Sequence, residues 1–289
     1  MTETSSPPDV DTTVQTRLDR VPTSVTRAWL VGAVLLILPE VGALIQFAVS
    51  ALPLGETAVA VADRIPVLLS RETIPNQGTL VPGEGWQGTF LGLSPAMAWG
   101  LRVGLIYVYG ALCLYWIWRG YLLYRNRYRT ASWTPFDDVV SRFRGHRWGQ
   151  FGLIVVLAFL ILAVFAPALG PTTLEQNAID PYSYELDYYD EETGDIETIT
   201  VGTANTDTTS QGIDGRNVSP LTYDQYDRFH PFGTLPSGQD LFTQVALGAR
   251  VSLFIGLLAI TISGVVATSL ALISAYYGGL VDLAIVLVS

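Results

Sequence analysis

The chain carries four blocks of apolar residues that are long enough to cross a membrane, at residues 29–49, 99–118, 148–169 and 251–275. A transmembrane helix needs about 20 such residues, and a helix satisfies its own backbone hydrogen bonds inside a bilayer. The sequence therefore predicts an all-α polytopic membrane protein with four complete transmembrane helices. The apolar run 283–289 predicts the start of a fifth helix, too short for a bilayer about 30 Å thick, so we expect a truncated chain.

The distribution of charge predicts which segments face the cytoplasm. Seven arginines lie between residues 119 and 147, beside only two acidic residues, so this Arg-rich loop is expected inside. Fourteen acidic residues lie between Glu175 and Asp240, so the loop 170–247 is expected to be extracytoplasmic. The polar segment 1–28 is then a cytoplasmic tail, and its composition predicts disorder.

The composition excludes several classes of function. A formal net charge of -10, with no Lys in the chain, argues against nucleic acid as a partner. The balance resembles that of proteins from salt-loving archaea, whose acidic surfaces stay hydrated in concentrated salt. One cysteine and two histidines cannot supply a metal cluster, and the sequence has no phosphate-binding loop, nucleophile elbow or zinc-protease motif. We expect no catalytic, cofactor or metal site, and hence no enzyme.

Glu40 is an ionisable residue near the middle of the first apolar block, next to Pro39. Proline is expected to kink the helix, and a charge at membrane depth is costly unless it is paired or protonated. Glu40 is therefore a candidate intramembrane polar site. The alternative is that it faces a neighbouring helix or marks the end of a shorter one.

The remaining connections give weaker expectations. Residues 52–98 contain several prolines and predict a connecting loop, with 58–69 as a short amphipathic helix on the membrane surface. Arg102 lies close enough to the end of the second block to snorkel toward water. Within the acidic loop, the turn at 193–195 is flanked by apolar residues and predicts a small β-hairpin.

The stretch from His230 to Arg250 is turn-rich and leads directly into the fourth apolar block. Prolines and glycines predict a loop in its first half, and Asp240 stands where a carboxylate would cap a helix that starts at Leu241. This pattern is also typical of an ordinary interfacial helix, for which Asp240 and Arg250 would be a cap and an anchor.

Four short motifs occur here in order: HPFGT at 230–234, G-x-D at 238–240, GARVSL at 248–253 and YYGGLVD at 276–282. Together they resemble the C-type inner-membrane permease of dipeptide and oligopeptide ABC importers, over roughly residues 139–289. Leu235, Gln239 and Gln244 depart from that family's usual pattern. The family's motif residues map onto an outer-entrance set in this sequence: His230, Gly233, Thr234, Gly238, Asp240, Gly248 and Arg250.

The resemblance implies a division of the chain and a set of partners. Residues 148–289 would begin the permease transmembrane domain, and 29–118 would be a two-helix N-terminal extension. A second permease subunit, cytoplasmic ATPase subunits, an extracellular solute-binding protein and membrane lipids would be the partners of a multi-pass cell-membrane protein that moves peptides or similar solutes by alternating access. The family's ATPase-docking loop would lie beyond Ser289. The competing hypothesis is a membrane-anchored sensor or interaction protein whose acidic loop is the working domain.

Overall fold

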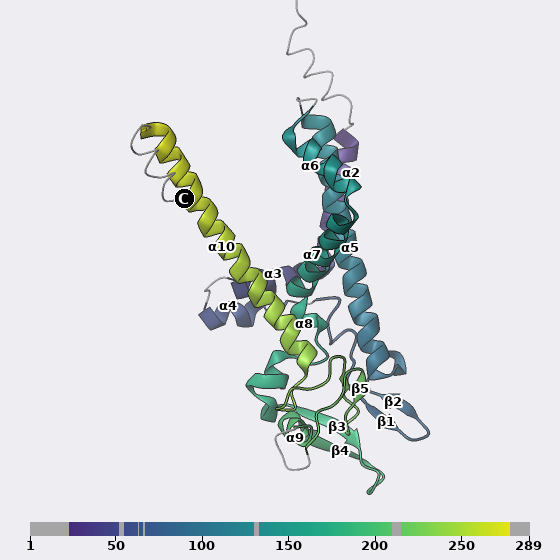
Figure 1. Cartoon of the computed structure of the whole chain (residues 1–289). Coiled ribbons are helices and arrows are strands. Elements are labelled where there is room, and N and C mark those ends of the chain that lie inside the picture. The colour runs from purple at the N-terminus through teal and green to yellow at the C-terminus, as the bar shows by residue number, and fades with distance from the viewer. Residues whose placement is uncertain are drawn as a thin grey trace, which may run out of the picture.

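The fold consists of a lobe that contains the β-strands and two helical arms that extend from it (Figure 1). The computed structural model describes residues 23–51, 55–62, 64–65, 67–129, 133–209 and 215–277. In Figure 1 helix α10 forms one arm, while α2, α5, α6 and α7 form the other. Within these described ranges, four segments are long and apolar enough to cross a membrane, which confirms the predicted polytopic helical class: Ser24–Val49, Pro95–Asn126, Arg147–Val164 and Leu241–Tyr276.

The first apolar segment is a broken helix. Helix α2 (Thr23–Ile37) ends in a 3-10 turn, η1 (Leu38–Glu40), and α3 (Val41–Ala51) follows. The predicted kink at Pro39 is confirmed, because proline lacks an amide hydrogen and its ring clashes with the preceding turn. The predicted tail extended too far, since α2 already begins at Thr23; residues 1–22 of that tail lie outside the described part of the chain.

Helices α2 and α5 (Pro95–Tyr128) are joined by two reciprocal tryptophan contacts. Trp29 Nε1 donates to Trp116 O and Trp116 Nε1 donates to Trp29 O, each at 3.2 Å. Each indole lies over a glycine of the opposite helix. A Cβ on Gly32 would lie 2.3 Å from the Trp116 ring, and a Cβ on Gly120 would lie 2.3 Å from the Trp29 ring. We call these four residues the Trp–Gly clasp.

The Arg-rich segment 119–147 is mostly helical, so the expectation of a loop there was wrong. Helix α5 continues to Tyr128, and α6 (Pro135–Gly145) follows a gap in the described chain. Thr134 and Asp137 form a capping box at the start of α6, and Asp137 also binds Arg125 and Arg129. Arginine is a good helix former, so the charge of this segment did not indicate its backbone conformation.

Helix α7 (Arg147–Val164) and the short α8 (Ala166–Leu169) lead into the lobe. The lobe contains a π-helical turn η3 (Glu175–Ile179), the 3-10 turn η4 (Pro181–Ser183) and helix α9 (Val201–Asp207). Ile106, Ile161, Phe165 and Leu169 form the main apolar core where α5, α7 and α8 meet above the lobe.

Three two-stranded antiparallel sheets complete the lobe. The predicted hairpin is confirmed as β3 (Glu185–Tyr189) and β4 (Ile196–Thr200), with Leu186 opposite Ile199. The segment 52–98 contains a short helix as expected, but α4 spans Gly55–Ala62 and not 58–69. It also holds the pair β1 (Thr79–Val81) and β2 (Gly85–Gln87) and the turn η2 (Phe90–Gly92), which the sequence did not predict. The third pair is β5 (Thr222–Tyr223) with β6 (Phe229–His230).

Helix α10 (Leu241–Tyr277) is one continuous helix of 37 residues. The predicted helix start at Leu241 is confirmed, but the sequence assigned residues up to 247 to the extracytoplasmic segment and 251–275 to a membrane helix, whereas one helix covers both. At about 1.5 Å per residue the helix is about 55 Å long, more than a bilayer's apolar thickness. Tyr276 and Tyr277 end the described helix; the rest of the expected turn and of the fifth helix lies outside the described residues.

Candidate functional site

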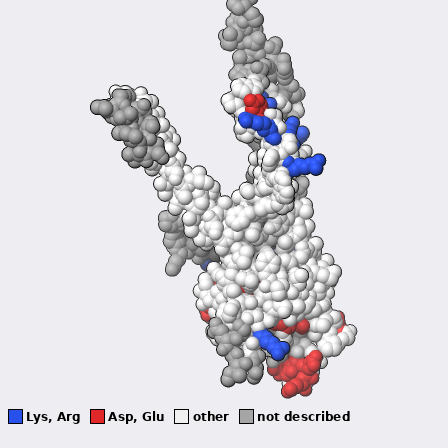
Figure 2. Space-filling view, viewed as in Figure 1, with Lys and Arg blue, Asp and Glu red and all other residues white. Residues whose placement is uncertain are grey.

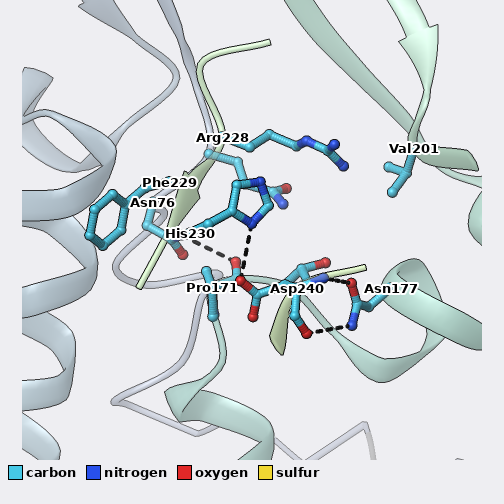
Figure 3. A pocket seen from close by; sticks show the side chains of 10 residues that line it. Asn76, Pro171, Asn177, Val201, Arg228, Phe229, His230 and Asp240 are labelled. Atoms are coloured by element: carbon cyan, nitrogen blue, oxygen red, sulfur yellow. Dashed lines mark hydrogen bonds and ion pairs between the residues drawn. The ribbon is translucent and has the colours of Figure 1, made fainter. Parts of the chain in front are cut away.

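The candidate site lies where β6, the loop 231–239 and the start of α10 meet. Figure 3 shows His230 and Asp240 facing one another there, with Asn177 on the far side of Asp240. His230 Nδ1 lies 3.1 Å from Asp240 Oδ2, and His230 Nε2 lies 3.3 Å from Asp224 Oδ2. Both ring nitrogens therefore face carboxylates, and only the doubly protonated imidazolium can donate to both. His230 and Asp240 are 3% and 2% exposed.

Asp240 caps α10, as the sequence predicted. Its Oδ1 accepts the backbone N–H of Thr243 at 2.7 Å and the Thr243 hydroxyl at 2.8 Å. The Asp240 backbone is held by Asn177, whose Oδ1 accepts the Asp240 N–H at 2.8 Å and whose Nδ2 donates to Asp240 O at 3.1 Å. The two oxygens of one carboxylate thus join the helix cap to His230.

The loop between His230 and Asp240 needs two glycines in the left-handed region. Gly233 has φ +79 and Gly238 has φ +81. A Cβ on Gly233 would lie 2.5 Å from Val218 O, and one on Gly238 would lie 1.8 Å from Asn205 O. Thr234 accepts the Val218 N–H through its hydroxyl at 2.9 Å. The HPFGT and G-x-D motifs therefore close a tight loop against the lobe.

Arg228 and Asp224 complete a buried charged cluster with His230 and Asp240. Arg228 Nε donates to Asp224 Oδ2 at 2.6 Å. Burial raises the pKa of Asp224, but the hydrogen bond from His230 and the charge of Arg228 outweigh it and lower that pKa below its ordinary value. Burial lowers the pKa of His230, but hydrogen bonds to Asp224 and Asp240 outweigh it and raise that pKa. Two carboxylates, one guanidinium and one imidazolium give a cluster with no net charge.

Gly248 and Arg250 lie further along α10 and do not join this cluster. The Cβ position of Gly248 has no atom within 4 Å. The Arg250 guanidinium lies 5.2 Å from the centroid of the Phe47 ring on α3, a distance at which a cation and an aromatic face attract one another. The outer-entrance set is therefore divided between the folded cluster at the cap and a contact between α10 and the broken first segment.

Glu40 lies apart from the site, in the turn η1. It is 1% exposed, and its Oε1 accepts the backbone N–H of Leu69 at 2.7 Å. Its Oε2 has no hydrogen-bond partner among the residues that the structure describes. Glu40 thus lies in the turn between α2 and α3 and binds the loop that follows α4, which favours the structural interpretation; a role in transport stays a prediction.

Arg102 and Arg71 are the important residues that sequence reasoning missed. The expectation that Arg102 snorkels to water was wrong, because its side chain is 0% exposed. It donates to Ala168 O at 2.9 Å, to Gly170 O at 3.0 Å and to Ile74 O at 2.7 Å. Arg71 donates to Gly170 O at 3.0 Å and to Thr172 O at 2.7 Å, and burial lowers its pKa to about 10. Both arginines satisfy carbonyls at the end of α8, where a helix favours cations.

Asn76 connects this arginine contact to the candidate site. Its Oδ1 accepts from Arg102 Nη1 at 2.7 Å, and its Nδ2 donates to Pro171 O at 3.1 Å. Together with His230 and Asp240 it lines a small cavity of about 20 Å³, which has room for about one water molecule. Among the described residues, no group of three or more His, Cys, Asp or Glu could hold a metal ion.

Comparison with known proteins shows what parts of the chain are similar to. Residues 134–187 match the family model described as the N-terminal TM domain of oligopeptide transport permease C. The chain is similar to peptide-transport permeases. It is 26% identical over 156 residues to the dipeptide transport system permease protein of Haemophilus influenzae, covering 54% of this chain and 41% of that protein. It is 25% identical over 160 residues to the corresponding protein of Alkalihalophilus pseudofirmus, covering 55% and 39%.

The oligopeptide transport system permease protein of Bacillus subtilis is 26% identical over 151 residues, which cover 52% of this chain and 36% of that protein. The matched part of this chain is thus about two fifths of the length of these relatives. No solved structure matches the chain significantly. The matches are to permease subunits and not to a catalytic family, and with the four apolar helices they support a multi-pass membrane protein.

Proposed function

We propose that this chain is a transmembrane permease subunit of an ABC importer for peptides or similar small solutes, and that it forms part of the translocation pathway. The observation that carries the proposal is the match of residues 134–187 to the permease family model. That range runs from the start of α6 into β3, so it includes α7, α8 and the first part of the lobe. Helix α7 is a candidate membrane span, and α8 contributes Leu169 to the core beside the lobe.

The surface of α10 supports a role in a larger assembly. None of the most apolar 18-residue window in this helix is buried by the rest of the described chain. Its first turns pack against α7 and α8, and beyond them large side chains such as Ile260 are mostly exposed. Helix α10 also carries small residues suited to close helix packing, among them Gly256 and Gly264. A second permease subunit and lipid are the proposed neighbours of this surface.

The distribution of charge supports the proposed orientation. Figure 2 shows most of the basic side chains on this face at the end of the arm that carries α6 and most of the acidic ones at the tip of the lobe, with a largely uncharged surface between them. We assign the Arg-rich end, and with it the N-terminus, to the cytoplasm. The lobe would then meet the solute-binding protein outside, and cytoplasmic ATPase subunits would drive alternating access. The outer-entrance residues would fix α10 to the lobe while the helices move.

Uptake by cells tests this proposal. Source cells that lack this chain should lose uptake of a labelled dipeptide or oligopeptide, and uptake should return with the wild-type chain. A cysteine at exposed position 260 (Ile260→Cys, with Cys113→Ser) should crosslink to a second permease subunit in native membranes. Unchanged uptake of every peptide tried, together with crosslinks that never include a transporter subunit, would refute the proposal.

The folded lobe favours a second candidate, a membrane-anchored sensor or interaction protein. Three strand pairs and a buried charged cluster make the lobe more than a connecting loop. Replacing residues 186–199 by a short Gly-Ser linker separates the two functions. A permease should keep binding its transporter subunits after this change, whereas a sensor should lose its partner while uptake of peptides is unaffected.

We also propose that the acidic surface is an adaptation to concentrated salt. The hairpin β3–β4 carries Asp190, Glu191, Glu192 and Asp195 around its exposed turn. Their mutual repulsion is screened by salt, which has a Debye length of about 3 Å at 1 M. The unfolding temperature of the detergent-solubilised protein should therefore rise between 0.1 M and 2 M KCl, and a flat or falling profile would contradict this adaptation.

A further inference from the structure

A groove of about 490 Å³ lies between α2 and α5, at the end of these helices that faces the basic side of the molecule. Trp29 and Trp116 form part of its wall, and Leu122 and Leu123 continue the apolar surface along α5. The groove belongs to two candidate membrane spans, so its walls lie where acyl chains meet the interface. A ligand that fits it must be largely apolar.

The Trp–Gly clasp keeps this groove open and fixed in shape. Each indole is held by its hydrogen bond to the backbone of the opposite helix and by contact with the glycine beneath it. The two rings therefore cannot turn to fill the groove without breaking contacts between α2 and α5. A preformed groove lowers the conformational-entropy cost of binding, because the protein side is already ordered.

The rim of the groove adds a positive charge to these apolar walls. Arg119 lines the groove and its side chain is exposed. Arg27, one residue from the lining residue Ala28, is also exposed. Among the described residues that line the groove, none is acidic. An apolar cleft between membrane helices with arginine at its rim matches an amphiphile with an anionic head.

The N-terminal segment of this chain is a poor match for the groove. Residues 1–22 come directly before α2, but Thr, Ser, Pro and Asp dominate them. Burying such side chains against tryptophan and leucine would desolvate polar groups without partners, which costs free energy. A phospholipid has the required acyl chain, and it is present at high concentration around both helices.

We propose that the groove is a binding site for one anionic phospholipid. The headgroup phosphate lies at Arg119, which presents several N–H donors to phosphate oxygens. An acyl chain lies along the wall made by Trp29, Trp116 and the two leucines. Tryptophan suits this depth because its ring is apolar and its N–H is polar. This inference depends on the membrane location of α2 and α5 and is independent of which solute the chain transports.

Native mass spectrometry of the full chain in detergent tests the proposal, with dioleoyl phosphatidylglycerol and dioleoyl phosphatidylcholine as the probes. The wild-type chain should retain one phosphatidylglycerol in preference to phosphatidylcholine. Arg119→Gln should weaken retention of phosphatidylglycerol about fivefold, the effect expected for one basic contact. The matched control is Arg144→Gln, which removes an exposed arginine on α6 that does not line the groove.

A second variant tests the groove itself. Ala28→Trp fills it from α2 and should abolish the retained lipid, while the unfolding temperature in detergent without added lipid shows whether the helices still pack. Equal retention of the two lipids overturns the proposal. Equal effects of Arg119→Gln and Arg144→Gln also overturn it, because they would indicate general attraction to a basic surface. Retention that persists in a folded Ala28→Trp variant also overturns the proposal, because the lipid would then bind outside the groove.

Discussion

His230 Nδ1 lies 3.1 Å from Asp240 Oδ2, so the first residue of the HPFGT motif is bound to the residue that caps α10. The other oxygen of Asp240 accepts the Thr243 amide at the start of the 37-residue helix α10. One carboxylate therefore binds both the His230 imidazole and the first turn of this helix. The free energy of folding of the lobe should therefore depend on pH.

The stability of the lobe should be highest between about pH 3.8 and pH 6.5, the ordinary pKa values of Asp and His. The pKa of His230 is raised in the folded chain, so its contribution is complete below 6.5 and is lost as pH rises through the raised value. The pKa of Asp224 is lowered, so its contribution is present above 3.8 and is lost as pH falls through the lowered value.

Thermal unfolding in detergent, measured from below pH 3.8 to well above pH 6.5, follows the effect. His230→Gln should be less stable than wild type near pH 6 and should lack the decrease above pH 6.5. If wild type and variant show the same decrease above pH 6.5, the titrating group is not His230.

Replacing Arg102 by Met should destabilise the junction between α5 and α8 by at least about 3 kcal/mol, because several buried carbonyls would lose their donor. Arg102→Lys should restore part of this stability, since an ammonium can reach only some of the acceptors. Chemical unfolding measures the difference. Arg27→Met is the control, since Arg27 is exposed on α2; equal effects at positions 27 and 102 would rule out the structural role of Arg102.

Gly238→Ala should unfold the loop before α10, since a Cβ would lie 1.8 Å from Asn205 O in addition to the strain of φ +81. Gly83→Ala measures the cost of backbone strain alone, because Gly83 has φ +87 but no atom within 4 Å of its Cβ position. We expect about 1 kcal/mol for Gly83→Ala and clearly more for Gly238→Ala. Hydrogen exchange at the Thr243 amide measures the opening of the cap, and similar exchange rates in the two variants would count against a tight loop.

Gly32→Ala should weaken the packing of α2 on α5 by about 1–3 kcal/mol, because the new methyl group would overlap the Trp116 ring. Gly104→Ala on α5 has open space at its Cβ and should be neutral or slightly stabilising. Tryptophan fluorescence during unfolding reports on both. A destabilisation as large for Gly104→Ala as for Gly32→Ala would show that helix content, and not the clasp, is what changes.

The features that the sequence predicted correctly depend on residues that lie close together in the chain. Hydropathy located the four membrane segments because a bilayer selects length and apolarity within one helix. Asp240 was identifiable as a cap because its carboxylate accepts from the amide of Thr243, only three residues further along the chain. The turn at 193–195 was recognisable from its flanking apolar residues, and the hairpin β3–β4 formed around it.

Long-range contacts explain what the sequence could not show. Arg102 donates to carbonyls 66 and 68 residues away along the chain. Its neighbours in the sequence do not reveal these acceptors, so its position near the end of an apolar block suggested water as its partner. The contact of His230 with Asp224 and Asp240 depends on the sharp turns at Gly233 and Gly238. Pairing of β1 with β2 was missed because each strand has only three residues, too few for a pattern to be distinguished from the surrounding turns.

Because α10 is one continuous helix, a small tilt at the Asp240 cap produces a larger displacement at its far end. A rigid rod about 55 Å long that pivots by about 10° moves its far end by about 10 Å, while the residues at the pivot hardly shift. A change of a few degrees at the cap would therefore move the far end of α10 by several ångströms. The close packing at Gly233 and Gly238 would hold the start of α10 in place during such a tilt.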